Sequence, residues 1–110
     1  MQNVFQRYDL ILSPTTSCLP VRNAADRNTT GPREIEGVPV EPLIGFCQTF
    51  FFNFTGHPAA SVPAGLSASG LPVGMQIAGK RFRDEDVLAA AKAFEEAQPW
   101  DYEIPLSRPI

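Results

Sequence analysis

The chain has 110 residues, of which nine are basic and twelve acidic, and its formal net charge is −3. This length fits one domain at most. A hydrophobic content of 44% is ordinary for a folded protein and too high for a disordered one. The charges are scattered without a basic cluster, so we expect neither nucleic acid nor a membrane as a partner.

No segment predicts membrane insertion or export. The longest apolar-rich run, residues 43–54, is too short to cross a bilayer and contains Gln48, Thr49 and Asn53. The first residues do not form a charged stretch that leads into a long apolar core, as a secretory signal would. We therefore expect a cytoplasmic protein.

Cysteine and histidine are scarce, with Cys18, Cys47 and His57 the members of these two residue types. Their positions do not have metal-ligand spacing, so neither a metal nor another cofactor is expected. Two reduced thiols fit a cytoplasmic protein. The sequence leaves a disulfide between Cys18 and Cys47 open.

In chain order, residues 4–8 predict a helical turn, and the apolar residues 10–12 predict a short strand that ends at a Ser-Pro pair. A continuous apolar run of this kind is typical of a strand buried on both faces, inside a parallel or mixed sheet. Residues 19–42 lose periodicity and gather Asn, Thr, Gly and Pro, which predicts a long loop. Loops of this length usually lie over other protein or over a functional site.

Residues 43–54, LIGFCQTFFFNF, predict a helix with apolar side chains around nearly its whole circumference. Such a helix must be buried on several sides. Gly56 is well placed to end it in the left-handed conformation, and Pro58 prevents its continuation. The side chain of Asn53 is expected to bond backbone groups near that end.

Two further strands are predicted at residues 59–63 and 73–78. Gly65 and Gly70 lie between them and supply turn geometry, so we expect an antiparallel hairpin.

A second helix is predicted from Asp84, which serves as its cap, with further acidic residues in the first turn. Pro99 ends this helix, and residues 99–110 are expected to form an extended tail that packs through Trp100 and Tyr102. The apolar stripe at helical spacing consists of Val87, Leu88, Ala91 and Phe94.

These elements predict an α/β fold with a few strands of a mixed sheet, two helices and a long loop. So few elements cannot cover every face of the apolar helix at residues 43–54. The missing cover is expected from another part of a larger protein or from a second copy of this chain.

Residues 53–79 resemble the carboxy-terminal hallmark of the amidase signature family. The hallmark combines an Asn, a Gly-X-Pro-Ala turn, a strand that ends in Val-Pro-Ala-Gly, a Gly-Leu-Pro-Val-Gly turn and a strand that carries Gln. The residues that match this pattern are Asn53, Gly56, Pro58, Ala59, Val62, Pro63, Gly65, Gly70, Leu71, Pro72, Gly74 and Gln76. Residues 8–15 and the acidic-capped helix also resemble the family, so the similarity covers nearly the whole chain.

The resemblance implies that residues 1–110 form the carboxy-terminal segment of an amidase-signature domain, and hence part of that fold. Family members hydrolyse or transfer amides with a lysine, a cis-configured serine and a nucleophilic serine. The lysine and a Gly/Ser-rich stretch lie in their amino-terminal half, which has no counterpart in this sequence. We therefore assign no catalytic residue to this chain and expect it to be inactive alone.

Some residues are of the types that serve as catalytic groups in enzymes, but we interpret them differently. Ser67 and Ser69 lie in a predicted hairpin tip and are interpreted as turn residues, because a serine nucleophile needs a base and oxyanion donors within reach. Lys80 is interpreted as a solvated charge at a strand end and Asp9 as a strand-edge residue. His57 is interpreted as a variable loop residue.

The resemblance also indicates a substrate site. Relatives that act in glutaminyl-tRNA formation carry an acidic residue seven positions before the Asn matched to Asn53, and Phe46 takes that place here. Losing the carboxylate makes glutamine a doubtful substrate, whereas an apolar side chain suits an aryl or aliphatic amide. The residues expected to line one wall of the pocket are Ser13, Thr15, Thr16, Phe46 and Thr49. The alternative is that Phe46 and Thr49 only pack the buried helix.

Three functional hypotheses follow. The first is an inactive segment of an amide-hydrolysing enzyme, whose partners are a missing amino-terminal amidase half and a small amide substrate. The second is a non-enzymatic interaction module or split-gene subunit that completes a partner chain or self-associates through the apolar helix. The third is a small independent hydrolase based on Ser67 or Ser69 with a lysine.

Overall fold

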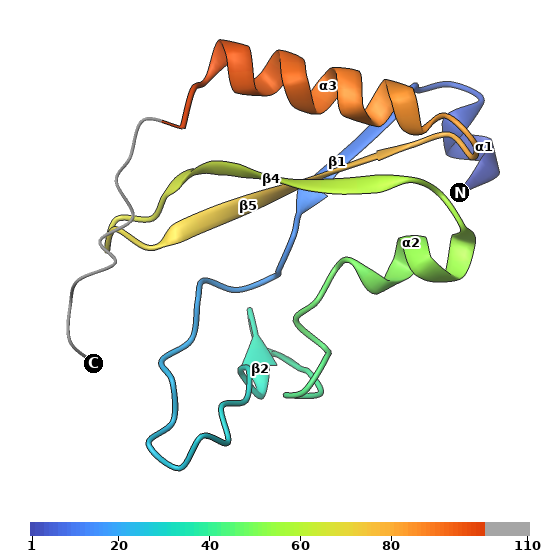
Figure 1. Cartoon of the computed structure of the whole chain (residues 1–110). Helices are drawn as coiled ribbons and strands as arrows, with labels where there is room; N and C mark the ends of the chain where they lie inside the picture. The colour runs from blue at the N-terminus through green and yellow to red at the C-terminus, as the bar shows by residue number, and fades with distance from the viewer. Residues whose placement is uncertain (101–110) are drawn as a thin grey trace.

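The computed structural model describes residues 1–100. The predicted extended tail at 99–110, including the packing of Tyr102, lies outside the described residues from position 101 onward. In chain order the elements, shown in Figure 1, are α1 (Gln2–Phe5), β1 (Leu10–Pro14), β2 (Glu34–Ile35), β3 (Val38–Pro39), α2 (Phe50–Thr55), β4 (Ala59–Leu66), β5 (Pro72–Gly79) and α3 (Asp84–Ala97).

Within the described residues, the main sheet has three strands in the order β1-β5-β4. β4 and β5 form the predicted antiparallel hairpin, with Ala60 opposite Ile77 and a register shift between Pro63 and Gly65. The prediction for residues 10–12 was wrong in its placement. β1 runs antiparallel to β5 at an outer position, and Leu12 is 59% exposed. The α/β fold class is confirmed.

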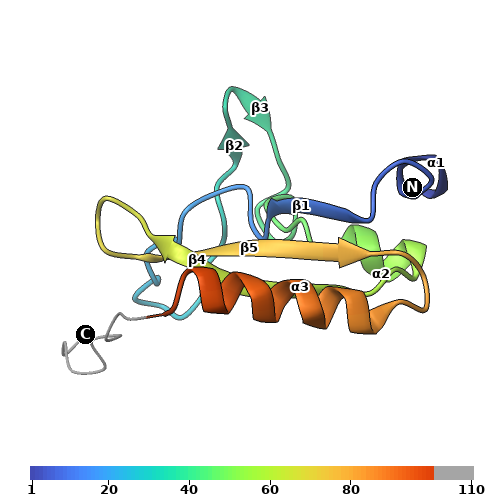
Figure 2. The same ribbon diagram turned by 90° about the horizontal axis from the view of Figure 1, so that it is seen from above.

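Helix α3 covers one face of this sheet and runs along β5 (Figure 2). The buried core consists of Val62, Ile77 and Val87. Of the predicted stripe, Leu88 was assigned wrongly because its side chain is 66% exposed. Ala90 takes its place, so that the side chains packed against the sheet follow the i, i+3, i+4, i+7 spacing of one helix face. They are Val87, Ala90, Ala91 and Phe94.

The amino-terminal end of α3 differs from the prediction by one residue. Arg83 occupies the N-cap position and Asp84 is the first helical residue, without a side-chain capping bond. Arg83 instead donates two hydrogen bonds of 2.8 Å to the carboxylate of Asp86. The acidic first turn is present as predicted. Its negative side chains interact favourably with the positive end of the helix dipole. Across residues 1–100, none of the helices combines the length and apolarity that a membrane span needs.

The helix predicted at residues 43–54 is shorter in the structure, where α2 begins at Phe50. The preceding residues form turns. The carboxylate of Glu41 accepts hydrogen bonds from the backbone of Leu43 and Ile44, and Gly45 approaches Glu41 so closely that an added Cβ would lie 2.7 Å from its backbone. The predicted end is confirmed, because Gly56 has φ 67° and caps α2 in the left-handed conformation.

Within residues 1–100, the segment 43–54 is not buried on several sides as predicted. Phe52 is buried, whereas Leu43, Ile44 and Phe54 are 72%, 53% and 84% exposed. α2 lies on the side of the sheet opposite α3 (Figure 1). The described part of the chain therefore leaves a helix with large apolar side chains in contact with solvent.

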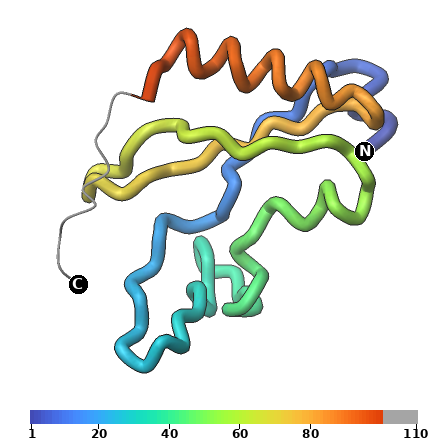
Figure 3. Tube along the Cα trace, in the orientation of Figure 1, coloured from blue at the N-terminus to red at the C-terminus, as the bar shows by residue number. Residues whose placement is uncertain are grey.

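The segment predicted as one long loop, residues 19–42, contains a short hairpin. Figure 3 follows the backbone between β1 and α2 as an excursion away from the sheet. Within it, β2 and β3 pair antiparallel across Glu36 and Gly37, which both have positive φ. Two such residues form the tight connection that suits the twist of a hairpin. We refer to residues 19–42 as the excursion loop.

His57 lies directly after α2 and is 9% exposed. Its ring stacks on Phe5 with the centroids 4.8 Å apart, so it joins the amino-terminal helical turn to the end of α2. Its Nδ1 makes no hydrogen bond to any described residue. Burial lowers the pKa of His57, and the neighbouring cation Arg81 lowers it further.

The lowered pKa of His57 predicts that acid destabilises the fold. Unfolded His57 binds a proton near its ordinary pKa of 6.5, whereas folded His57 does so only at lower pH. The free energy of unfolding should therefore be constant above this value and fall as pH decreases toward the folded pKa. Urea denaturation between pH 7.5 and 5.5 measures it. His57→Phe, which keeps an aromatic ring against Phe5, should flatten the profile. An equally steep fall in that variant would contradict the assignment.

Candidate functional site

The backbone after β1 lies beside the backbone before α2. Thr16 and Cys47 form an isolated antiparallel bridge. On either side of it, the Ser17 N–H donates to the Phe46 carbonyl at 2.8 Å, and the Gln48 N–H donates to the Thr15 carbonyl at 3.1 Å. The two segments predicted to line a pocket are therefore joined, although some thirty positions separate them in the chain.

A row of polar side chains crosses the sheet on the face away from α3. Ser13, Gln76 and Ser61 are directly opposite one another in β1, β5 and β4, so their side chains point to the same face. Gln76 is 2% exposed. Its amide donates to the Ser13 hydroxyl at 3.1 Å and to the Gln48 carbonyl at 3.4 Å. A buried amide thus links the sheet to the segment before α2.

Two more contacts extend this row. The Gln48 amide donates to the Ser17 hydroxyl. The hydroxyls of Thr15 and Ser61 are hydrogen-bonded to each other at 2.6 Å. Gly74 lies beneath this pair, and an added Cβ would be 2.8 Å from the Thr15 hydroxyl. Glycine is required at this position because the side chains of Thr15, after β1, and Ser61, on β4, occupy the space.

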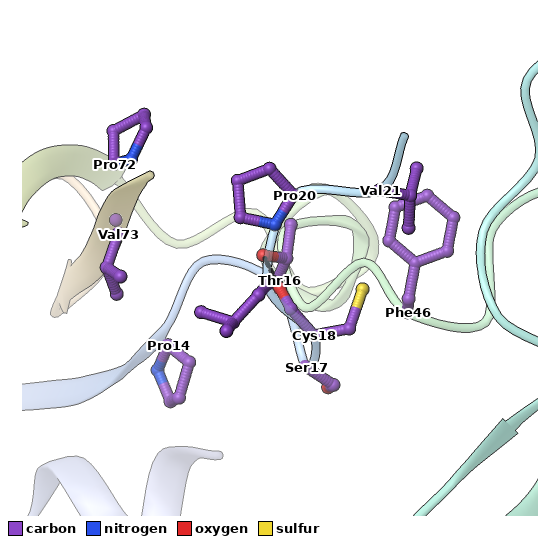
Figure 4. Close-up of a pocket in the computed structure, with 11 residues that line it drawn as sticks. Pro14, Thr16, Ser17, Cys18, Pro20, Val21, Phe46, Pro72 and Val73 are labelled. Atoms are coloured by element: carbon purple, nitrogen blue, oxygen red, sulfur yellow. Dashed lines mark hydrogen bonds between the residues drawn. The ribbon is translucent and has the colours of Figure 1, made fainter. Parts of the chain in front are cut away.

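A concave depression of about 510 Å³ lies next to the bridge, and we call it the Phe46 depression. It is lined by Pro14, Thr16, Ser17, Cys18, Leu19, Pro20, Val21, Phe46, Pro72, Val73 and Gly74. Figure 4 shows Pro72 and Val73 at one end, Phe46 and Val21 at the other, and Thr16 between them. Most of these side chains are apolar, with a few hydroxyls and a thiol, which is the usual character of a small-molecule site.

The predicted pocket residues occupy different positions around this depression. Thr16 and Phe46 line it, whereas the hydroxyls of Ser13 and Thr15 are engaged in the polar row below. Thr49 is the exposed residue at the N-cap of α2 and does not line the depression. Substrate binding by these five residues stays a prediction.

The hallmark residues shape the backbone around the site. Gly56 has φ 67° at the end of α2, and Gly65 and Gly70 have φ 129° and 78°, in the register shift of β4 and in the hairpin turn. The Pro58 carbonyl accepts the Gly79 N–H at 3.0 Å, which closes the end of the sheet nearest α2. Pro63 lies at the register shift, Pro72 begins β5, and Asn53 is exposed on α2.

The hydroxyl groups of Ser67 and Ser69 bond to each other at 3.0 Å in the hairpin turn. Ser67 also accepts the Leu71 N–H, as a turn residue does. Lys80 forms an exposed ion pair of 2.8 Å with Asp9 at the far end of β5. This ion pair links the residue before β1 to the residue after β5. Lys80 therefore does not serve as a base for Ser67 or Ser69. Residues 1–100 also contain no group of three or more His, Cys, Asp and Glu that is suited to hold a metal.

Sequence reasoning missed several residues of the site. Leu19, Pro20 and Val21 were assigned only to a long loop, and their apolar character was the available local signal for a pocket wall. Gln48 and Ser61 carry no such signal, because their partners are fixed by the register of strands far away in the chain.

Comparisons with known proteins agree with this geometry. The amidase family profile matches residues 1–88. The chain belongs to the amidase signature family. In a crystal structure of a bacterial aryl acylamidase of this family, a region with 56% sequence identity superposes on 100% of this chain with a TM-score of 0.92. The family resemblance of the sequence is thereby confirmed.

Two curated relatives are much longer than this chain. An acylamidase of Rhodococcus erythropolis is 40% identical over 96 residues, which are 84% of this chain and 19% of the relative. A glutamyl-tRNA(Gln) amidotransferase subunit from Dehalococcoides mccartyi is 38% identical over 103 residues, or 94% of this chain and 19% of the relative. The aryl acylamidase is matched over 23% of its chain. This amidase-family chain therefore spans about a fifth of the length of these relatives.

Gln76→Met removes the buried amide while keeping an unbranched side chain of similar length. The Gln48 carbonyl then loses this donor, and the free energy of unfolding should fall by about 1–3 kcal/mol. Urea denaturation measures the change. The matched control is Gln98→Met, because the amide of Gln98 bonds the Ala64 carbonyl at the surface, and this change should stay within about 0.5 kcal/mol. Equal effects of the two substitutions would contradict the structural role of Gln76.

Proposed function

We propose that this chain is the carboxy-terminal segment of an amide-hydrolysing amidase-signature enzyme and that it supplies one wall of the substrate pocket. The Phe46 depression is the observation that carries this proposal. Its lining accepts an aryl or aliphatic group through Phe46, Val21 and Val73. Thr16, whose hydroxyl donates to the Cys18 carbonyl at 2.9 Å, lies between the two ends. The proposed substrate is a small amide with an apolar substituent.

The lack of a charged group at the depression supports this substrate class. None of its lining residues is an Asp, Glu, Lys, Arg or His. A substrate that carries an ammonium or carboxylate group would lose its hydration there without gaining a charged partner. An uncharged amide avoids this cost, and the names of the acylamidase relatives agree with that choice.

The nucleophile belongs to another part of the enzyme in this proposal. Ser67 and Ser69 are turn residues, and Lys80 is paired with Asp9. The lysine and serines that the family uses are expected in the amino-terminal half, so this chain alone is inactive.

A chimeric enzyme tests the proposal. In it, this chain replaces the matched 96 residues of the Rhodococcus acylamidase. The chimera should hydrolyse acetanilide, whereas the purified 110-residue chain should not. Phe46→Ala in the chimera should lower kcat/KM for acetanilide about tenfold relative to acetamide, because the apolar contact is lost. Steady-state kinetics with both amides measures this ratio.

Two outcomes would contradict the proposal. One is a folded chimera that cleaves neither amide. The other is cleavage by the chain alone that disappears in Ser67→Ala or Ser69→Ala, which would favour a small independent hydrolase. An unchanged substrate ratio in Phe46→Ala would remove Phe46 from the pocket and leave it as a packing residue.

A second candidate function is an interaction module or split-gene subunit that completes a partner chain. The observation in its favour is the α2 patch, which we define as Phe50, Phe51 and Phe54. The Phe50 ring stacks on Phe51 at 4.7 Å and meets Phe54 edge-on at 6.2 Å, and Phe54 is 84% exposed. Contiguous aromatic groups of this kind mark association surfaces.

The α2 patch predicts self-association of the isolated chain. Replacing Phe51 and Phe54 by Ser should raise the dissociation constant by about tenfold or more, because two aromatic side chains no longer leave water on association. Sedimentation equilibrium measures it. Phe82→Ser is the matched control, since Phe82 is 90% exposed and lies outside the patch. A monomeric unaltered chain at high concentration would contradict the prediction.

A further inference from the structure

The position of Phe46 is fixed through its backbone. The Phe46 carbonyl accepts the Ser17 N–H at 2.8 Å, which ties it to the segment after β1. The turn before it closes with the Gly45 N–H on the Glu41 carbonyl at 2.7 Å. With the Cα held in this way, the direction of the aromatic ring depends on what lies against it.

Gly31 of the excursion loop lies against the Phe46 ring. A Cβ added to Gly31 would overlap Cδ1 and Cε1 of that ring. The Gly31 N–H donates to the Pro42 carbonyl at 2.7 Å, so the glycine is itself held in place. Its φ does not lie in the left-handed region, and an added Cβ would be closer to the ring than to the Pro42 carbonyl oxygen, which would lie 3.0 Å away.

The Phe46 ring is in contact with both Gly31 and the Phe46 depression. Phe46 lines the depression and touches Gly31, whereas Gly31 is absent from the lining. A group that grows from position 31 therefore pushes the ring toward the depression. Rotation of the ring is the easiest response, because its atoms are the far end of a side chain whose backbone is bonded on both sides.

We propose that Gly31 is a positioning residue for Phe46, which sets the width of the Phe46 depression and hence the size of the aryl or alkyl group that it accepts. This inference rests on the proposed function and adds to it that the excursion loop determines substrate size. Val21, from the same loop, lines the depression near Phe46, so the loop contributes both part of the lining and the support behind the neighbouring ring.

The test uses the 110-residue chain itself and two uncharged probes, acetanilide and 4-isopropylacetanilide. Their affinities are measured by titration in ¹H–¹⁵N correlation spectra. Gly31→Ala should lower the affinity for the larger probe by about fourfold or more relative to acetanilide, which corresponds to losing the contact of one or more methylene-sized groups. Phe46→Leu should shift the ratio the other way.

A double substitution separates positioning from a general structural role. In a Phe46→Ala background there is no ring to displace, so Gly31→Ala should leave the affinity ratio unchanged. Val38→Ala is the matched control, because Val38 belongs to the excursion loop, is 61% exposed and does not line the depression. It should not alter the ratio.

The outcomes distinguish this inference from the proposed function. If the unaltered chain binds neither probe, this inference is overturned, whereas the proposed function is judged separately by the chimera. If it binds both and Gly31→Ala leaves the ratio unchanged, or lowers both affinities in parallel, the role of Gly31 is overturned while the pocket stands. A ratio that changes equally with and without the Phe46 ring would also overturn it.

Discussion

The side-chain amide of Gln76, on β5, donates to the Ser13 hydroxyl on β1 and to the Gln48 carbonyl before α2. It thereby joins three segments that are far apart in the chain. It is buried, and a buried amide without partners is strongly unfavourable, so the three segments are held in one arrangement. The Phe46 depression depends on that arrangement. Its floor comes from β5 and its side from the segment that the amide fixes.

The sheet therefore has two faces of different chemistry. Ile77 and Met75 alternate with Gln76 along β5, so the apolar residues meet α3 while the amide points to the other side. One face supplies the burial that stabilises the fold. The other uses hydrogen bonds between side chains to place a non-regular segment, which apolar packing alone would position less specifically.

The parts of the fold that could be predicted are those determined by residues close together in the sequence. The β4–β5 hairpin and the left-handed end at Gly56 follow from glycine positions, and α3 follows from its periodicity. The helix at 43–54 was predicted too long, because apolar content does not reveal that Glu41 captures the backbone amides of the following turn. Leu88 was misplaced because it and Val87 are adjacent and both apolar, and only packing against the sheet selects one helix face.

The site was predictable to a smaller extent for a related reason. Thr16 and Phe46 were singled out through the family resemblance, and both line the depression. The contribution of Val21 and the contact of Gly31 with Phe46 depend on how the excursion loop returns to the sheet. No local pattern records that path, since it is fixed by non-local bonds such as that between Ser17 and Phe46.

β1 and β4 are the outer strands of the sheet that residues 1–100 form, and each contains a proline, Pro14 and Pro63. Proline has no N–H, so it interrupts the row of donors that an outer strand presents to another chain. The hazard of such rows is uncontrolled strand addition that leads to fibrils. In the sheet formed by residues 1–100, the two prolines therefore reduce the number of backbone donors that the outer strands offer for strand addition.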